Sequence, residues 1–301
     1  MATAIVADGA REHLGHGPVA IGLALIGALL YLVTLIAVLG GRAAPSTPTA
    51  LSFVAGSGAL AAVASGGLAV LLTIAAGAGW ATIAVRGGLA RPRTSTGALP
   101  GGALLATVAT QAVLVAGATE LARRHGPGAR ELILWGGSAL CLLGVALYCV
   151  FIPSLVRGLR ARGGERPAGD DWIAMGALAI SALAASTLSE AMRRLGAPTE
   201  IARVAADLGA ACWLGASAWL APLLWRERRW LLGRVPRTYG FDRWATVFPL
   251  GMYAVSAAAV ARALDWREPL DTISAGALAV ALAAWLATAA GGLRTTLTHP
   301  R

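Results

Sequence analysis

Long apolar segments separated by short polar stretches repeat along almost the whole chain. The clearest of them cover residues 18–39, 101–122, 131–156, 172–190, 200–225, 243–263 and 270–292. Each is close to the length of about 20 residues that a helix needs to cross the hydrocarbon core of a bilayer. The pattern therefore predicts an all-α integral membrane protein.

One apolar run, residues 51–85, is too long for a single crossing. As one helix it would measure about 50 Å, whereas the hydrocarbon core is about 30 Å thick. Ser65, Gly66 and Gly67 interrupt the run, and such a cluster favours a turn. We expect two helices here, of which the first, near residues 50–65, is short for contact with lipid and is shielded by its neighbours.

Residues 1–17 fit neither a cleaved signal peptide nor a full crossing, because Asp8, Arg11 and Glu12 interrupt the apolar run early. Counting this fragment as a first helix gives ten helices arranged as five successive hairpins. More arginines then fall in the loops on the side that holds both termini. The positive-inside rule consequently predicts cytoplasmic termini.

Composition supports the membrane assignment and bounds the domain organisation. Of the 301 residues, 57% are hydrophobic and 13% are charged, whereas soluble domains carry about 25% charged residues. The apolar runs leave no room for a separate soluble domain, so we expect a single transmembrane domain over residues 1–301. The 25 basic residues are all arginines and give a net charge of +10, which we interpret as a determinant of topology and not as a nucleic-acid surface.

The sequence lacks the motifs of common enzyme and metal sites. No HExxH, GxSxG or Walker pattern occurs, and the histidines fall in loops or near the termini. His13 and His16 lie close together but lack a third ligand, and the three cysteines lie in apolar runs without CxxC spacing. We therefore expect no catalytic residues, no metal and no cofactor.

Charged residues are also scarce inside the predicted spans. Glu200, Arg203 and Asp207 share one helix face near the start of their span, where intrahelical bridges at the interface are the simpler interpretation. Ion-coupled carriers usually hold an ionisable group near the membrane midplane. The uncharged interior argues for a passive path and against stoichiometric proton coupling.

The segment RWATVFPLGMYAVSAAAVARAL, residues 243–264, raises a separate question. It is long enough to cross the membrane, yet it carries Phe248, Pro249 and Gly251 in its middle, and proline and glycine both weaken a helix. Either the helix is bent for packing reasons, with Phe248 as a packing residue, or something passes beside the break.

Five segments together resemble one known family. They are MATAIV at the start, LSFVAGSGAL at 51–60, LLATVATQAVLV at 104–115, DWIAMGALAISALA at 171–184 and FDRWATVFPLGMYAV at 241–255. In this order and spacing they are similar to the first, third, fifth, seventh and ninth helices of the tellurite-resistance/dicarboxylate transporter family, which includes slow-type anion channels.

The resemblance implies a homotrimer of ten-helix protomers in the bacterial inner membrane, each with a central pore lined by its odd-numbered helices. It also implies passive transport of anions, such as malate and other dicarboxylates or small inorganic anions, with a link to tellurite resistance in some bacteria. A phenylalanine of the ninth helix gates the family's pore, and Phe248 matches that position, with Pro249 and Gly251 at the helix kink. A proton-coupled dicarboxylate carrier is the alternative.

Small and polar residues of the other odd-numbered helices are candidates for pore lining. They are Ser52, Gly56, Thr107, Thr110, Gln111, Gly176 and Ser181. Hydroxyls and amides that face a pore replace part of an anion's hydration, but small residues also permit close helix packing. Both interpretations stay open.

The chain departs from the family at its first helix, which begins well before the position of Met1 in other members. Either an upstream start precedes this sequence, or this member has a half-length first helix and a modified pore. We expect residues 1–14 to form a short helix against the ninth-helix region, with a cleft open to the cytoplasmic side.

Overall fold

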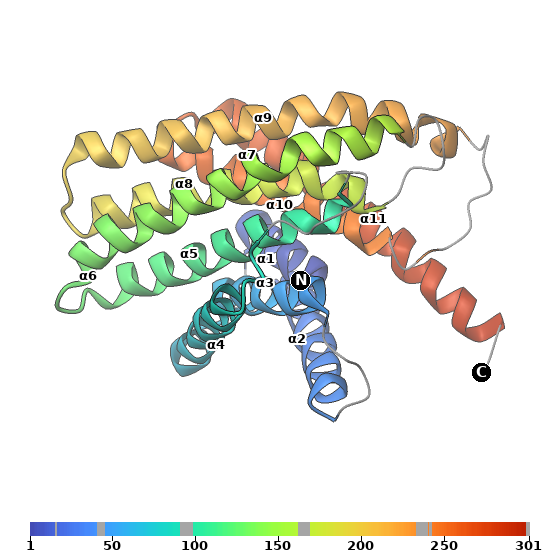
Figure 1. Ribbon diagram of the computed structural model, residues 1–301, viewed down its shortest axis with the longest axis horizontal. Helices are drawn as coiled ribbons and strands as arrows, with labels where there is room; N and C mark the ends of the chain where they lie inside the picture. The colour runs from blue at the N-terminus through green and yellow to red at the C-terminus, as the bar shows by residue number, and fades with distance from the viewer. Residues whose placement is uncertain are drawn as a thin grey trace.

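The computed structural model is a bundle of α-helices (Figure 1). It describes residues 1–15, 17–40, 46–90, 99–161, 169–232, 240 and 243–298, and no strand occurs within these ranges. The helices are α1 (Ala2–Leu14), α2 (Pro18–Leu39), α3 (Thr47–Val63), α4 (Gly66–Val85), η1 (Gly101–Leu104), α5 (Leu105–Arg124), α6 (Ala129–Glu131), η2 (Leu132–Gly137), α7 (Ser138–Ala161), η3 (Gly169–Trp172), α8 (Ile173–Arg194), α9 (Thr199–Leu231), α10 (Trp244–Leu264) and α11 (Arg267–Thr298).

Helices that follow one another along the chain pack together as five pairs. The pairs are α1 with α2, α3 with α4, α5 with α7, α8 with α9 and α10 with α11. The segments α6, η2 and α7 form one continuous span, Ala129–Ala161, so the described residues make ten helical segments. The predicted all-α architecture with ten helices is confirmed for the described residues.

The long apolar run is divided where the sequence predicts. Helix α3 ends at Val63 and α4 begins at Gly66. Gly66 has a φ of 60°, a left-handed conformation that glycine adopts without steric cost. The glycine therefore permits the tight turn between the two helices.

The first member of each hairpin lies inside the bundle. These five inner helices, α1, α3, α5, α8 and α10, contact one another in sequence, and α10 contacts α1, so they close a ring. In the most apolar stretches, 89% of residues are buried in α8 and in α10, against 17% in α2 and 11% in α4. The outer helices expose their apolar side chains, as lipid-facing helices do. Figure 1 shows α2 and α4 projecting from one side of the bundle.

Eight helical segments of the described chain are long and apolar enough to cross a membrane. They correspond to eight of the nine predicted spans. The ninth, α3, is apolar but has only 17 residues, fewer than the other eight. This length agrees with the expectation of a short, shielded helix. Its residues Val54 to Gly58 are buried among the inner helices.

Helix α1 has 13 residues and a length of about 20 Å, and it packs against α10, α2 and α3. The contact with α10 depends on Gly251, because a Cβ added there would lie 3.0 Å from Ile5 and 3.1 Å from Val6. The prediction of a short helix against the ninth-helix region is confirmed. The cleft on the cytoplasmic side stays a prediction.

Candidate functional site

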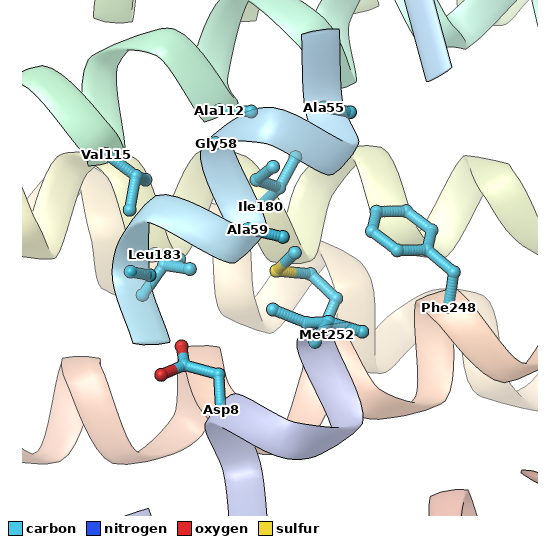
Figure 2. A pocket seen from close by; sticks show the side chains of 12 residues that line it. Asp8, Ala55, Gly58, Ala59, Ala112, Val115, Ile180, Leu183, Phe248 and Met252 are labelled. Carbon is cyan, nitrogen blue, oxygen red and sulfur yellow. The ribbon is translucent and has the colours of Figure 1, made fainter. Parts of the chain in front are cut away.

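A narrow cavity, here called the throat, lies on the axis of the inner ring. Figure 2 shows its lining side chains. All five inner helices contribute, through Ile5 and Asp8, Ala55, Gly58, Ala59 and Ala62, Ala112 and Val115, Ile180 and Leu183, and Phe248 and Met252. Its volume is about 20 Å³, and a cavity needs about 10–15 Å³ to hold one water molecule. The throat therefore has no room for a hydrated anion in this conformation.

The lining follows the periodicity of the helices. Residues three or four positions apart share a helix face, as do Phe248 and Met252 on α10 or Ala112 and Val115 on α5. Along all five helices the residue numbers rise in the same direction through the throat. The chain of every inner helix therefore runs in the same direction along the two cavities, with its carboxyl end towards the wider cavity described below.

Phe248 is the lining residue of α10 that lies farther from those carboxyl ends, since Met252 follows it along the helix. Its side chain is 1% exposed. Behind it lies Gly176 of α8, where an added Cβ would be 3.2 Å from Cε1 of Phe248 and 2.9 Å from Cγ of Pro249. The glycine leaves space for both rings, so α8 and α10 approach closely at this level.

A wider cavity of about 230 Å³, here called the vestibule, continues from the throat towards the carboxyl ends of the inner helices. Asp8, Ala62, Val115 and Leu183 line both cavities. The charged side chains around the vestibule are Asp8, Arg11, Glu12, Arg123, Glu190, Arg194 and Arg262. A narrow, mainly apolar throat thus opens into a polar space that accommodates several water molecules.

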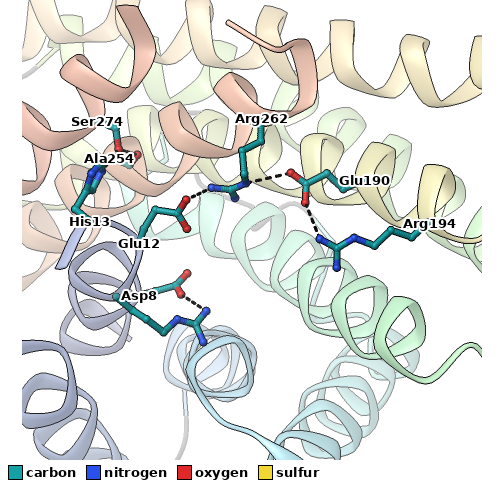
Figure 3. Close-up of polar contacts among 9 residues, drawn as sticks. Asp8, Glu12, His13, Glu190, Arg194, Ala254, Arg262 and Ser274 are labelled. Atoms are coloured by element: carbon teal, nitrogen blue, oxygen red, sulfur yellow. Dashed lines mark hydrogen bonds and ion pairs between the residues drawn. The ribbon is translucent and has the colours of Figure 1, made fainter. Parts of the chain in front are cut away.

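Ion pairs join three of the inner helices at the vestibule (Figure 3). The guanidinium of Arg262 on α10 donates to Glu12 on α1 and, with its Nε, to Oε1 of Glu190 on α8 at 3.2 Å. Arg194 approaches the other oxygen of Glu190 at 3.9 Å. The pairs bind α1 to α10 directly and link it to α8 through Arg262, although the helix is short.

A separate pair lies deeper, where Nη2 of Arg11 donates to Oδ1 of Asp8 at 2.9 Å. At the end of α1, His13 shares a hydrogen bond of 2.6 Å with Ser274 of α11, and Ser274 donates to the carbonyl of Ala254 at 2.7 Å. These contacts fix the carboxyl end of α1 to α10 and α11.

The polar candidates for pore lining lie mostly between helices and not on the throat. Nε2 of Gln111 donates to the carbonyl oxygen of Cys141 on α7 at 3.1 Å and to Ser181 on α8 at 3.3 Å. Thr110 accepts a hydrogen bond of 2.9 Å from the indole of Trp80 on α4. These contacts favour the packing interpretation for these side chains, and their exposure to a pore stays a prediction.

The remaining candidates differ in position. Gly56 faces Tyr31 of α2, where an added Cβ would lie 3.4 Å from Cδ2 of the ring. Ser52 is half-buried, and Thr107 is fully buried with a hydroxyl that has no hydrogen-bond partner among the described residues. Gly176 is the candidate that the structure brings against Phe248 and Pro249.

The charged residues at the site are absent from the sequence-based candidates, and Asp8 and Arg262 are examples. Asp8 is interpreted in the sequence as an interruption of an apolar run, and Arg262 lies at the end of the predicted span 243–263 without an assigned role. Their positions at helical spacing from Ile5 and from the Phe248 region are the signal that places them on the inner face. Of the bridges predicted among Glu200, Arg203 and Asp207 on α9, the one between Arg203 and Asp207 is confirmed, since Nε of Arg203 donates to Asp207 at 3.0 Å on the exposed surface. His16 and His299 lie outside the described residues.

A ring of buried helices inside a ring of lipid-facing helices, with a cavity on its axis, defines a multi-pass membrane protein of the channel and transporter class. Residues 8–293 match the model of the voltage-dependent anion channel family, so the chain belongs to this family. Membership confirms the resemblance, implies anion transport, and places the protein among channels and not among enzymes.

The similarity to curated relatives covers only part of the chain. The chain is 36% identical over 92 residues to an uncharacterized membrane protein of Mycobacterium tuberculosis, in each of two strains. The match covers 29% of this chain and 44% of the relative, so the chain spans less than half the length of these curated relatives. No solved structure matches the chain.

Proposed function

We propose that residues 1–301 act as one transmembrane domain that conducts anions passively along the axis of the inner ring, with Phe248 as the gate. The path leads from the vestibule into the throat and ends at the Phe248 ring. The observation that carries the proposal is that Phe248 lines a cavity to which all five inner helices contribute. An aromatic ring there blocks the path sterically and keeps the constriction dry.

Pro249 and Gly251 support the gate in different ways. Proline lacks the N–H that would bond the preceding turn, so the helix beside Phe248 is easier to bend. Gly251 allows α1 to approach α10 directly beyond the gate. A bend at Pro249 moves the Phe248 ring without requiring that the rest of α10 separates from its neighbours.

The identity of the anion, the assembly and the orientation are further parts of the proposal. Dicarboxylates such as malate and small inorganic anions are the candidate substrates, with a link to tellurite resistance. We propose a homotrimer in the bacterial inner membrane with cytoplasmic termini. In that orientation the vestibule faces the periplasm. Native mass spectrometry of the detergent-solubilised protein tests the trimer.

Replacing Phe248 tests the gate. Phe248→Ala should raise chloride flux in proteoliposomes well above that of the wild-type protein, because it removes the ring that closes the throat. Phe151→Ala is the matched control: Phe151 on α7 is also buried, at 2% exposure, but does not line the throat. Equal flux in wild type and Phe248→Ala, with both proteins folded and inserted, contradicts the gate.

A proton-coupled dicarboxylate carrier is the second candidate, and the position of Asp8 beside the path favours it. Such carriers need an ionisable group in the membrane interior. Imposing a pH gradient with equal malate concentrations on both sides separates the two functions. A coupled carrier accumulates malate against its gradient, whereas a passive channel does not.

A further inference from the structure

Asp8 occupies the junction between the two cavities, since its side chain lines both the throat and the vestibule. Among the described residues that line the throat it is the one that carries a charge. Its side chain is 12% exposed and pairs with Arg11. Figure 2 shows the carboxylate pointing from α1 towards the other lining residues. An anion that moves between the two cavities therefore passes this carboxylate at close range.

We propose that protonation of Asp8 controls the passage of anions between the vestibule and the throat. The inference rests on the proposed conduction path. An ionised carboxylate repels an anion strongly where the surroundings are apolar and little water screens the charges. When a proton from vestibule water binds one carboxyl oxygen, the group becomes neutral and its O–H can donate to the anion. The proton returns to vestibule water when the carboxyl ionises again.

Protonation also changes the role of Arg11. In the structure its guanidinium donates to Asp8, so the positive charge of Arg11 compensates the negative charge of the Asp8 carboxylate. A neutral Asp8 leaves this positive charge uncompensated beside the entrance of the throat. Low pH thus removes a barrier and adds an attraction at the same point.

Charged groups on α1, α5, α8 and α10 also face the vestibule. They are Glu12 on α1, Arg123 on α5, Glu190 and Arg194 on α8, and Arg262 on α10, whereas α3 contributes Ala62. Glu12 and Glu190 share the guanidinium of Arg262, and their side chains are 37% and 24% exposed. Both line the vestibule but not the throat. Asp8 is the carboxylate whose charge lies at the constriction.

Chloride flux into proteoliposomes, measured while the pH on the vestibule side is lowered from about 7 to about 5, tests the proposal. Chloride is the probe because its own charge does not change in this range. The protonated fraction of one carboxyl falls about tenfold for each pH unit above its pKa. Wild-type flux should rise several-fold on acidification, whereas Asp8→Asn should give high flux that changes less than about twofold across the range.

Asp207→Asn is the matched control. Asp207 also pairs with an arginine on its own helix, but it lies on the exposed surface of α9. It should keep the wild-type pH dependence. His13→Gln removes the imidazole that bonds to Ser274 at the end of α1 and should also keep it. Retention of the pH dependence by Asp8→Asn, or its loss in His13→Gln, overturns the proposal.

Asp8→Glu keeps the experiment decisive if Asp8→Asn does not fold. The longer side chain moves the carboxylate, so the pH midpoint of flux should shift, and an unchanged midpoint overturns the proposal. Different results refute the conduction path and the role of Asp8. Wild type and Phe248→Ala without flux at any pH refute the conduction path, whereas flux that is independent of pH in the wild type refutes only the role of Asp8.

Discussion

The ring of Phe248 on α10 lies against Gly176 on α8, and the two residues determine how closely these helices pack. A Cβ at Gly176 would lie 3.2 Å from Cε1 of Phe248 and 2.9 Å from Cγ of Pro249. Contacts this short force one neighbour to move. The proline ring is fixed to its own backbone, whereas the phenylalanine ring can change its rotamer.

Gly176→Ala should therefore displace the Phe248 ring. Overpacking of this kind costs about 1–3 kcal/mol of stability. We expect chloride flux above that of the wild type and below that of Phe248→Ala, because the ring is shifted and not removed. Flux in proteoliposomes and unfolding in detergent measure the two effects.

Gly117→Ala on α5 is the control for this prediction, since no atom lies within 4 Å of the added Cβ. Alanine is a better helix former than glycine by about 1 kcal/mol, so stability should stay equal or increase, and flux should match the wild type. Flux in Gly176→Ala that equals the flux in Gly117→Ala contradicts the proposed contact between gate and glycine.

Gln111 provides a test of the packing interpretation. Its amide nitrogen bonds to Cys141 and Ser181 between α5, α7 and α8, and its side chain is fully buried. Gln111→Met keeps the approximate shape and removes both hydrogen bonds, each of which contributes about 0.5–1.5 kcal/mol, so we expect a loss of stability of this order and no change in anion selectivity. A changed permeability ratio of nitrate to chloride would place Gln111 on the path.

The sequence predicts the helical layout well because lipid leaves few alternatives. Every backbone polar group in the hydrocarbon must be hydrogen-bonded within its helix. Apolar runs such as Pro18–Val38 therefore form helices independently of how their side chains pack. The turn at Gly66 and the short helix before Gly15 follow equally from residue types. Both are local features that need no knowledge of the packing.

The lining of the throat could not be predicted in the same way. The inner helices α8 and α10 are apolar almost all round, so no polar face marks the side that meets the axis. Choosing candidates by polarity selected Gln111 and Thr110, which bond to neighbouring helices, and passed over Ile180 and Met252, which line the throat. The position proposed for the gate depended on the family resemblance. The place of Asp8 became visible only when α1 was seen to enter the ring.

Arg262 is expected to maintain the charge balance of the vestibule. Its guanidinium bonds to Glu12 and Glu190. Arg262→Gln leaves these two carboxylates with less compensation, so the vestibule should repel anions and chloride flux should fall several-fold at low salt. The charges are screened over about 10 Å at 0.1 M ionic strength and about 30 Å at 0.01 M, so much of the flux should return when salt is raised.

The control is Arg267→Gln, because Arg267 is 64% exposed and only approaches Asp265, at 4.0 Å. It should leave flux unchanged at both salt concentrations. An equal loss in Arg262→Gln at low and high salt would indicate a displacement of α1 and would contradict an electrostatic role.

A buried ion pair at the opposite end of the bundle should stabilise the start of the gate helix. Nη1 of Arg243, directly before α10, donates to Oε1 of Glu227 on α9 at 2.7 Å, and the indole of Trp172 donates to the same oxygen at 3.1 Å. The side chains of Arg243 and Glu227 are 10% and 5% exposed. Removing one partner of such a pair costs about 3–5 kcal/mol, whereas an exposed pair contributes about 0–1 kcal/mol.

Glu227→Ala should therefore unfold in detergent at much lower denaturant concentration than Asp207→Ala, in which the replaced aspartate is 57% exposed. Because Arg243 lies five positions before Phe248, the loss of the ion pair should also displace the Phe248 ring, and the Glu227→Ala protein should conduct more chloride than the wild type. Equal stability of Glu227→Ala and Asp207→Ala would show that the buried pair does not stabilise the start of α10.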